Sequence, residues 1–155
     1  MATYRNIKTL YLDTNIFNRP FDDQSLVRVR LETIAIFSIL QRIKKGDCRL
    51  FWSFMIDFEN SRNPYQDNRL EISMMSSIAT YFIGPNKEIR ESGKHFEKLG
   101  IKPRDALHLA CAVNGGADFF ITCDDKLAKR AKLMQIPLQV YNPIDFTFAT
   151  EVRQL

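Results

Sequence analysis

The sequence lacks the cysteine patterns and glycine-rich loops that mark several classes of protein. Among its 155 residues are only three cysteines, Cys48, Cys111 and Cys123, with no CxxC or Cys/His spacing. The odd count and the apolar surroundings of two of them predict buried reduced thiols, and make a zinc site or a disulfide framework a poor interpretation. There is also no glycine-rich loop of the kind that cradles phosphates, so chemistry on nucleoside triphosphates is not supported.

Long apolar runs are missing as well. No stretch approaches the roughly 20 apolar residues that a membrane-spanning helix requires. Residues 1–15 lack the basic, apolar and small-residue layout of a secretory signal, so we expect a cytoplasmic protein without membrane contact. Internal repeats, low-complexity segments and linkers are absent too, and the length predicts a single domain over residues 1–155.

What the sequence does contain is enough apolar bulk for a core. Apolar residues make up 45% of the chain and charged residues 26%, and there are twelve Phe, five Tyr and one Trp. These proportions are typical of globular proteins. The formal net charge of +4 and the isoelectric point near 9.0 allow a polyanionic partner, but many proteins without such a partner share this balance.

Short, apolar, β-rich segments alternate with longer segments of helical period. Strands are predicted at residues 7–12, 48–52, 81–83, 119–122 and 138–141. Helices are predicted at residues 25–45, from Ser53 as N-cap to before Pro64, and at 66–80, 86–99, 103–114 and 126–134. Residues 14–23 are interpreted as a polar turn. Strands separated by helices predict a mostly parallel sheet covered on both faces, a three-layer α/β/α sandwich.

The helix predicted at residues 25–45 is apolar on two sides. One stripe consists of Val29, Ile36, Leu40 and Ile43, with Phe37 at its edge, and a shorter stripe on the opposite side consists of Val27, Leu31 and Ile34. The second stripe is consistent with a surface for a protein partner, but an ordinary buried helix explains it equally well. A homodimer is the assembly we expect.

Acidic residues lie at or after the ends of the predicted strands. Asp13 and Asp124 follow two strands, Glu59 lies on the helix after residues 48–52, and Asp105 begins the helix at 103–114. Taken singly, each is explained by a turn or a helix cap. Because the carboxyl ends of parallel strands meet at one edge, the four carboxylates can share a cleft. Clustered carboxylates repel one another, and Mg²⁺ or Mn²⁺ is the natural ion to neutralise them.

Four segments, in order, resemble the PIN-domain nucleases. They are YLDTN at residues 11–15, Ser53-x₅-Glu59, KPRDALHLACA at 102–112 and ITCDDKL at 121–127. The resemblance spans residues 10–143. It implies a compact α/β/α sandwich and Mg²⁺- or Mn²⁺-dependent cleavage of single-stranded or structured RNA. Bacterial members of the family are often toxins paired with a small antitoxin, so the resemblance also implies an antitoxin as a candidate partner.

The resemblance assigns roles residue by residue. It implies four catalytic and metal-binding acids: Asp13, Glu59, Asp105 and Asp124. Thr14 or Asn15 fits the family's polar position beside the first acid, and the T-x-D spacing from Thr122 favours Asp124 over Asp125. Asp57 lies two residues before Glu59 and should face another side of the helix, so Glu59 is the preferred second acid.

Basic residues beside the acidic positions are candidates for contacts with the RNA backbone. Arg19, Arg104 and Lys126 are the preferred ones, although charged runs on helices are usually solvated. His108 lies three residues after Asp105, so a bond to that carboxylate is one interpretation and a packed core histidine is the preferred one. His95 is interpreted as a surface helix residue.

Two other classes of function remain open. An aspartyl-phosphate phosphatase would need a second acid where this sequence has Asn15, which cannot serve as acid or base, and the acidic pair and late lysine of a receiver domain are not found. The alternative to a nuclease is a catalytically silent PIN-like module that binds RNA or protein. The four filled acidic positions count against that alternative.

Overall fold

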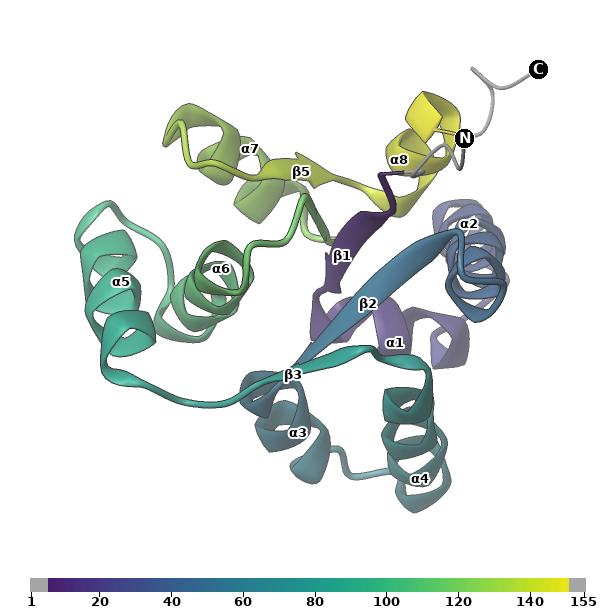
Figure 1. The fold of residues 1–155 in the computed structure, drawn as a ribbon. Coiled ribbons are helices and arrows are strands. Elements are labelled where there is room, and N and C mark those ends of the chain that lie inside the picture. Colours follow the sequence, from purple (N-terminus) through teal and green to yellow (C-terminus); the bar gives the residue numbers. More distant parts are fainter. Residues whose placement is uncertain (1–5, 151–155) are drawn as a thin grey trace, which may run out of the picture.

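The computed structural model describes residues 6–150 as a parallel β-sheet enclosed by helices (Figure 1). Residues 1–5, part of the segment inspected for a secretory signal, and residues 151–155 lie outside the described residues. The five strands pair in the order β3-β2-β1-β4-β5, and each ladder is parallel. Their bounds are Lys8–Leu12 for β1, Cys48–Ser53 for β2, Tyr81–Ile83 for β3, Phe119–Ile121 for β4 and Gln139–Tyr141 for β5.

Helices fill the connections between the strands. They are α1 (Thr14–Asn18), α2 (Val27–Lys44), α3 (Phe54–Ser61), α4 (Gln66–Met75), α5 (Lys87–Lys98), α6 (Pro103–Gly115), α7 (Asp125–Leu133) and α8 (Pro143–Thr150), with short 3₁₀ turns η1 (Arg19–Phe21) and η2 (Ser76–Ile78). Connections between parallel strands are right-handed, so connections that run in opposite directions across the sheet cover opposite faces. Figure 1 shows α2 and α8 on one side of the sheet and α5 and α6 on the other. The predicted three-layer α/β/α sandwich is confirmed.

Two helices differ from the sequence-based prediction. Residues 14–18, predicted as a polar turn, form α1, because the side chain of Asp13 accepts a hydrogen bond from the backbone N–H of Thr14 and caps the helix. No element was predicted after residue 141, yet α8 follows β5 directly. The side-chain oxygen of Asn142 accepts from the backbone N–H of Ile144 at 2.8 Å, and the proline at the first position favours the helix start.

Helix α2 separates its two apolar stripes between the core and the surface. The first stripe, Val29, Ile36, Leu40 and Ile43, is buried, whereas Val27, Leu31 and Ile34 are exposed. Phe37, predicted at the edge of the buried stripe, is exposed as well. The three cysteines are buried, as predicted. Within residues 6–150, no helix is both long enough and apolar enough to cross a bilayer.

The order of the strands indicates where on the sheet a ligand site is expected. The chain leaves β1 toward β2 on one side and returns to β4 on the other, so β1 and β4 flank the point where the strand order reverses. In open α/β sheets, ligands bind beyond the carboxyl ends of the strands at such a point. The backbone N–H of Asp13 donates to the carbonyl of Ile121 at 2.9 Å, which brings the ends of β1 and β4 together.

Candidate active site

Asp13 lies at the carboxyl end of β1 and is 5% exposed. One carboxylate oxygen accepts from the backbone N–H of Thr14 at 2.8 Å, and the other accepts from the hydroxyl of Thr122 at 2.9 Å and from the side-chain amide of Asn15 at 3.1 Å. Burial raises the pKa of Asp13, and the charge of His108 and the bond from Thr122 offset only part of that effect. The carboxylate is therefore held in one orientation at some electrostatic cost.

Asn15 and Thr122 link the two strand ends to each other. The amide nitrogen of Asn15 donates to the hydroxyl of Thr122 at 3.1 Å, and its carbonyl oxygen accepts from the backbone N–H of Cys123 at 3.0 Å. The hydroxyl of Thr122 also accepts from the backbone N–H of Asp124 at 3.0 Å. Both predicted polar residues thus fix the backbone around two of the predicted acids.

Glu59 extends from α3 into the same group. Its carboxylate accepts from the hydroxyl of Thr14 at 2.8 Å and from Nε2 of His108. Because a carboxylate only accepts, Nε2 of His108 carries the proton in this bond. Burial opposes the charged form of Glu59, but the bonds from His108 and Thr14 and the charges of His108 and Arg104 outweigh it, so the pKa of Glu59 lies below its usual value.

His108 is the centre of a buried chain of hydrogen bonds. Its Nε2 lies 3.8 Å from Asp13, and its Nδ1 pairs with the hydroxyl of Tyr11 at 2.6 Å. The Tyr11 hydroxyl also pairs with the hydroxyl of Ser53 at 2.6 Å, and Ser53 caps α3. Burial lowers the pKa of His108, but the bond to Glu59 and the charges of the surrounding carboxylates raise it by a larger amount. The pKa of His108 therefore lies above its usual value. The carboxylates around His108 thus favour its protonated form.

Asp105 faces the group from the first turn of α6 and is half-buried. Burial, followed by the charges of Asp13 and Asp124, raises the pKa of Asp105 to about 6. Burial is the larger cause, and the two neighbouring carboxylates add to it.

Asp124 caps α7 rather than joining the tight group. It is exposed, and its carboxylate accepts from the backbone N–H groups of Lys126 and Leu127 at 3.0 and 3.1 Å. The two neighbouring alternatives have partners elsewhere. Asp57 accepts from the indole N–H of Trp52 at 2.8 Å, and Asp125 pairs with Arg28 at 2.7 Å.

The three predicted RNA-contacting cations have different surroundings. Arg104 and Lys126 are exposed. Arg19 is partly buried and forms ion pairs with Asp22 at 3.0 Å and with the fully buried Glu32 at 3.3 Å. The guanidinium of Arg19 is therefore already held by two carboxylates.

Sequence reasoning missed the role of Tyr11 and misplaced the partner of His108. The preferred interpretation of His108 was a packed core histidine. Its side chain is buried, but it also forms hydrogen bonds with Glu59 and Tyr11. The three-residue spacing from Asp105 was the available signal for placing His108 near the acids. A tyrosine inside an apolar strand was a second signal, because a buried hydroxyl needs a hydrogen-bond partner. The exposed position of His95 on α5 is as predicted.

The donor set suits a hard divalent cation. One ligand atom each from Asp13, Glu59 and His108 lie within 4.8 Å of one another. Carboxylate oxygens are the ligands that Mg²⁺ and Mn²⁺ prefer, so Asp13 and Glu59 are the natural ligands here. Nε2 of His108 would have to lose the proton that it donates to Glu59 before it could bind Mn²⁺. Asp105 adds a further half-buried carboxylate close to this group, and the charge of Asp13 contributes to its raised pKa after the larger effect of burial. These residues therefore fit a Mg²⁺ or Mn²⁺ site.

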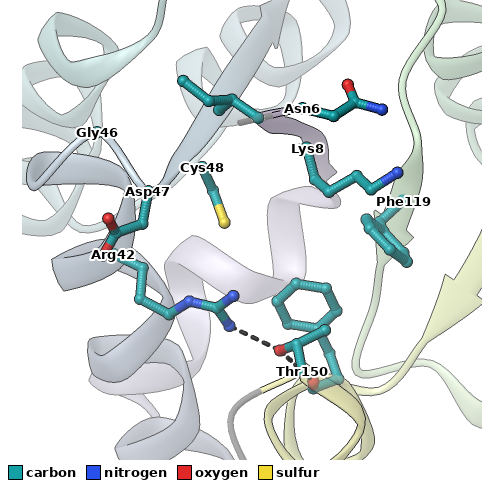
Figure 2. A pocket seen from close by; sticks show the side chains of 10 residues that line it. Asn6, Lys8, Arg42, Gly46, Asp47, Cys48, Phe119 and Thr150 are labelled. Atoms are coloured by element: carbon teal, nitrogen blue, oxygen red, sulfur yellow. Dashed lines mark hydrogen bonds between the residues drawn. The ribbon is translucent and has the colours of Figure 1, made fainter. Parts of the chain in front are cut away.

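A cavity of about 700 Å³ lies at the opposite end of the sheet, near the amino ends of β1 and β2. Figure 2 shows Lys8, Asp47 and Cys48 around it, with Arg42 bonded to the hydroxyl of Thr150 at 2.7 Å. Among the described residues that line it, Asp47 is the acidic one. The cluster of carboxylates is thus separate from this cavity and lies where the topology predicts a site.

Comparison with known proteins identifies the family of the chain. The sequence profile of the PIN domain matches residues 10–133. The chain belongs to the PIN-domain family. No curated protein sequence matches the chain significantly. PIN domains are generally nucleases that use divalent metals, and the candidate metal ligands of this PIN domain, Asp13, Glu59 and His108, lie inside the matched region.

Three solved structures share the fold of this PIN domain. VapBC2 from Rickettsia felis, crystallised with a DNA fragment from its promoter, aligns with a TM-score of 0.57 at 16% identity, over 86% of this chain and 98% of that one. FitAcB from Neisseria gonorrhoeae gives 0.58 at 13% identity over 86% and 97%, and VapBC-1 from nontypeable Haemophilus influenzae gives 0.57 at 20% identity over 87% and 98%. At these identities the likeness concerns the fold.

Proposed function

We propose that residues 1–155 form a single-domain, metal-dependent endoribonuclease that hydrolyses RNA phosphodiester bonds. The observation that carries the proposal is the convergence of ligand atoms from Asp13, Glu59 and His108 within 4.8 Å at the carboxyl edge of a PIN-domain sheet. The half-buried Asp105 and the exposed Asp124 lie close enough for their charges to interact beside the cluster. This arrangement supports hydrolysis over a purely structural role, because carboxylates from separate elements converge at the edge where open α/β sheets bind ligands.

Each side chain has a proposed task in that reaction. Asp13 and Asp105 would be the direct ligands of the metal, and Glu59 and Asp124 would complete the acidic edge. A bound Mg²⁺ or Mn²⁺ supplies Lewis acidity that lowers the pKa of a water molecule and stabilises charge on the leaving oxygen. The polar residues Thr14, Asn15 and Thr122 orient the carboxylates of Asp13 and Glu59 through the bonds described above.

The RNA backbone is proposed to lie along cations beside the acids. Arg104 precedes Asp105, and Lys126 follows Asp124, so both flank the edge where the scissile phosphate would lie. Arg19 is the third proposed contact, but its ion pairs with Glu32 and Asp22 mean that it would have to share its guanidinium with these groups. Contacts of this kind make RNA binding weaken steeply with salt.

The test is cleavage of a labelled RNA pool by the wild-type protein, by Asp13→Asn and by Asp57→Asn, each with Mg²⁺, Mn²⁺ or EDTA. We expect metal-dependent fragments from the wild type and from Asp57→Asn, because Asp57 bonds to Trp52 and not to the cluster. Asp13→Asn should lower the rate at least about 100-fold, since even residues that only support a metal ligand cost 10- to 100-fold. Wild-type turnover by Asp13→Asn would contradict the proposal, and no cleavage by any folded protein would favour a silent binding module.

We also propose a small antitoxin as a partner. Two of the structures that share the fold are of VapBC proteins, and bacterial PIN-domain nucleases are often toxins paired with an antitoxin. The exposed apolar side of α2, Val27, Leu31, Ile34 and Phe37, is a surface that another chain, either a second copy of this protein or an antitoxin, can cover.

A further inference from the structure

A partly exposed aromatic ring lies directly beside the acidic edge. Phe58 on α3 immediately precedes Glu59, and the side chain is 41% exposed while that of Glu59 points into the cluster. A single exposed phenylalanine is ordinary on protein surfaces. The charged groups gathered over this ring are what distinguish it.

Two guanidinium groups from different helices lie over the Phe58 ring. The guanidinium carbon of Arg62, which ends α3, is 5.0 Å from the ring centroid, and that of Arg104, in the first turn of α6, is 5.6 Å from it. Both arginines are exposed, and within residues 6–150 neither forms an ion pair with a carboxylate. The two cations are therefore held beside an aromatic face and remain available to an anion.

The ring of Phe58 and its two arginines lie next to the acids, and this position indicates which kind of ligand they bind. Arg104 adjoins Asp105 and Phe58 adjoins Glu59, so the ring and the two cations continue the acidic edge outward from between α3 and α6. An aromatic face with flanking guanidinium groups is the combination that binds single-stranded nucleic acid, where bases stack on rings and phosphates bind to arginine.

We propose that Phe58, Arg62 and Arg104 form a subsite for one unpaired nucleobase of the RNA and the phosphate attached to it. The proposal rests on the ribonuclease function proposed above and specifies its substrate as RNA that is unpaired next to the cleaved bond. Bases in a duplex are stacked on one another and cannot offer a free face to the ring, so duplex RNA gains nothing from Phe58.

The experiment measures RNA affinity and not cleavage. Fluorescence anisotropy is recorded with a labelled single-stranded oligoribonucleotide and with a blunt RNA duplex, using Asp13→Asn protein with Mg²⁺ so that the probe stays intact. Into this background are placed Phe58→Ala, Phe58→Trp and, as a matched control, Phe148→Ala. Phe148 is 63% exposed on α8, well away from α3 in Figure 1.

We expect Phe58→Ala to weaken binding of the single strand about 10-fold and to leave duplex binding unchanged, with unaltered circular dichroism. Phe58→Trp should keep the affinity because it keeps a stacking face, and Phe148→Ala should have no effect. Unchanged single-strand affinity in Phe58→Ala, or equal losses for single strand and duplex, would overturn the subsite. So would loss of a co-purifying protein without any change in RNA affinity, which would assign the ring to a protein interface.

The outcome separates the subsite from the nuclease function. If the wild type cleaves RNA and Phe58→Ala binds it normally, the subsite fails and the nuclease stands. If the wild type cleaves nothing but Phe58→Ala loses single-strand affinity, the subsite stands as part of a binding module and the nuclease fails.

Discussion

His108 links helix α6 to two of the acids of the site. It donates to Glu59, lies 3.8 Å from Asp13 and is bonded to Tyr11, and it is almost fully buried. The hydrogen bond to Glu59 and the charges of Asp13, Glu59 and Asp105 raise its pKa against the opposing effect of burial. Removing the ring would leave a buried hydroxyl and a carboxylate without this partner.

We expect His108→Ala to lower the free energy of unfolding by about 2–3 kcal/mol, the usual penalty for leaving buried polar groups without partners. Urea unfolding followed by circular dichroism measures the change. His95→Ala is the matched control, because that histidine is exposed on α5 and its loss should change stability by less than about 0.5 kcal/mol. Equal stabilities of the two variants would mean that His108 is not a structural partner of the acids.

Helix α6 contributes two side chains to the site, Asp105 and His108. Pro103 starts the helix, and Gly116 ends it in the left-handed conformation with φ of 77°. An L-residue that has a Cβ atom is strained in this conformation, whereas glycine is not. The position of the helix along the sheet is thus fixed at both ends by residues that can be recognised in the sequence.

Gly116→Ala should destabilise the protein by about 1–2 kcal/mol through its backbone conformation alone, because a Cβ there would meet no atom within 4 Å. Gly84 is an ideal control, since a Cβ at this position also meets nothing within 4 Å but φ is not positive. Gly84→Ala should therefore be neutral or slightly stabilising. The free energies come from guanidinium unfolding curves, and equal effects of the two substitutions would refute a conformational cause.

The elements show how far sequence reasoning reaches. The strands and α6 were predictable because apolar runs, Pro103 and the glycines at 115–116 are local signals. Helix α1 was not, since its single cap, Asp13, was equally good evidence for a turn. In the site, the order of acids along the chain was visible, whereas the bond from His108 to Glu59 depends on how α6 docks against α3, which no local pattern encodes.

At the scale of the whole molecule, the surface of α2 is the feature that the core does not use. Residues spaced along one side of the helix, Val27, Leu31 and Ile34, are between 49% and 61% exposed. Together with the exposed Phe37, they form an apolar stripe on the outer side of α2. The opposite stripe of the same helix is buried in the core. An apolar stripe of this kind on a folded protein indicates an interface with another chain.

We expect this stripe to join two copies of the chain, so the purified protein should have twice the 18.1 kDa mass of one chain by light scattering. Leu31→Glu with Ile34→Glu should give the mass of one chain, because two buried carboxylates facing their symmetry mates cost more than the interface gains. Leu70→Glu with Met74→Glu is the matched control, since these exposed residues add the same charge on α4 and should leave the dimer intact. A wild-type protein with the mass of one chain would contradict the dimer and leave the stripe to the proposed antitoxin, because an uncovered apolar stripe still needs a partner.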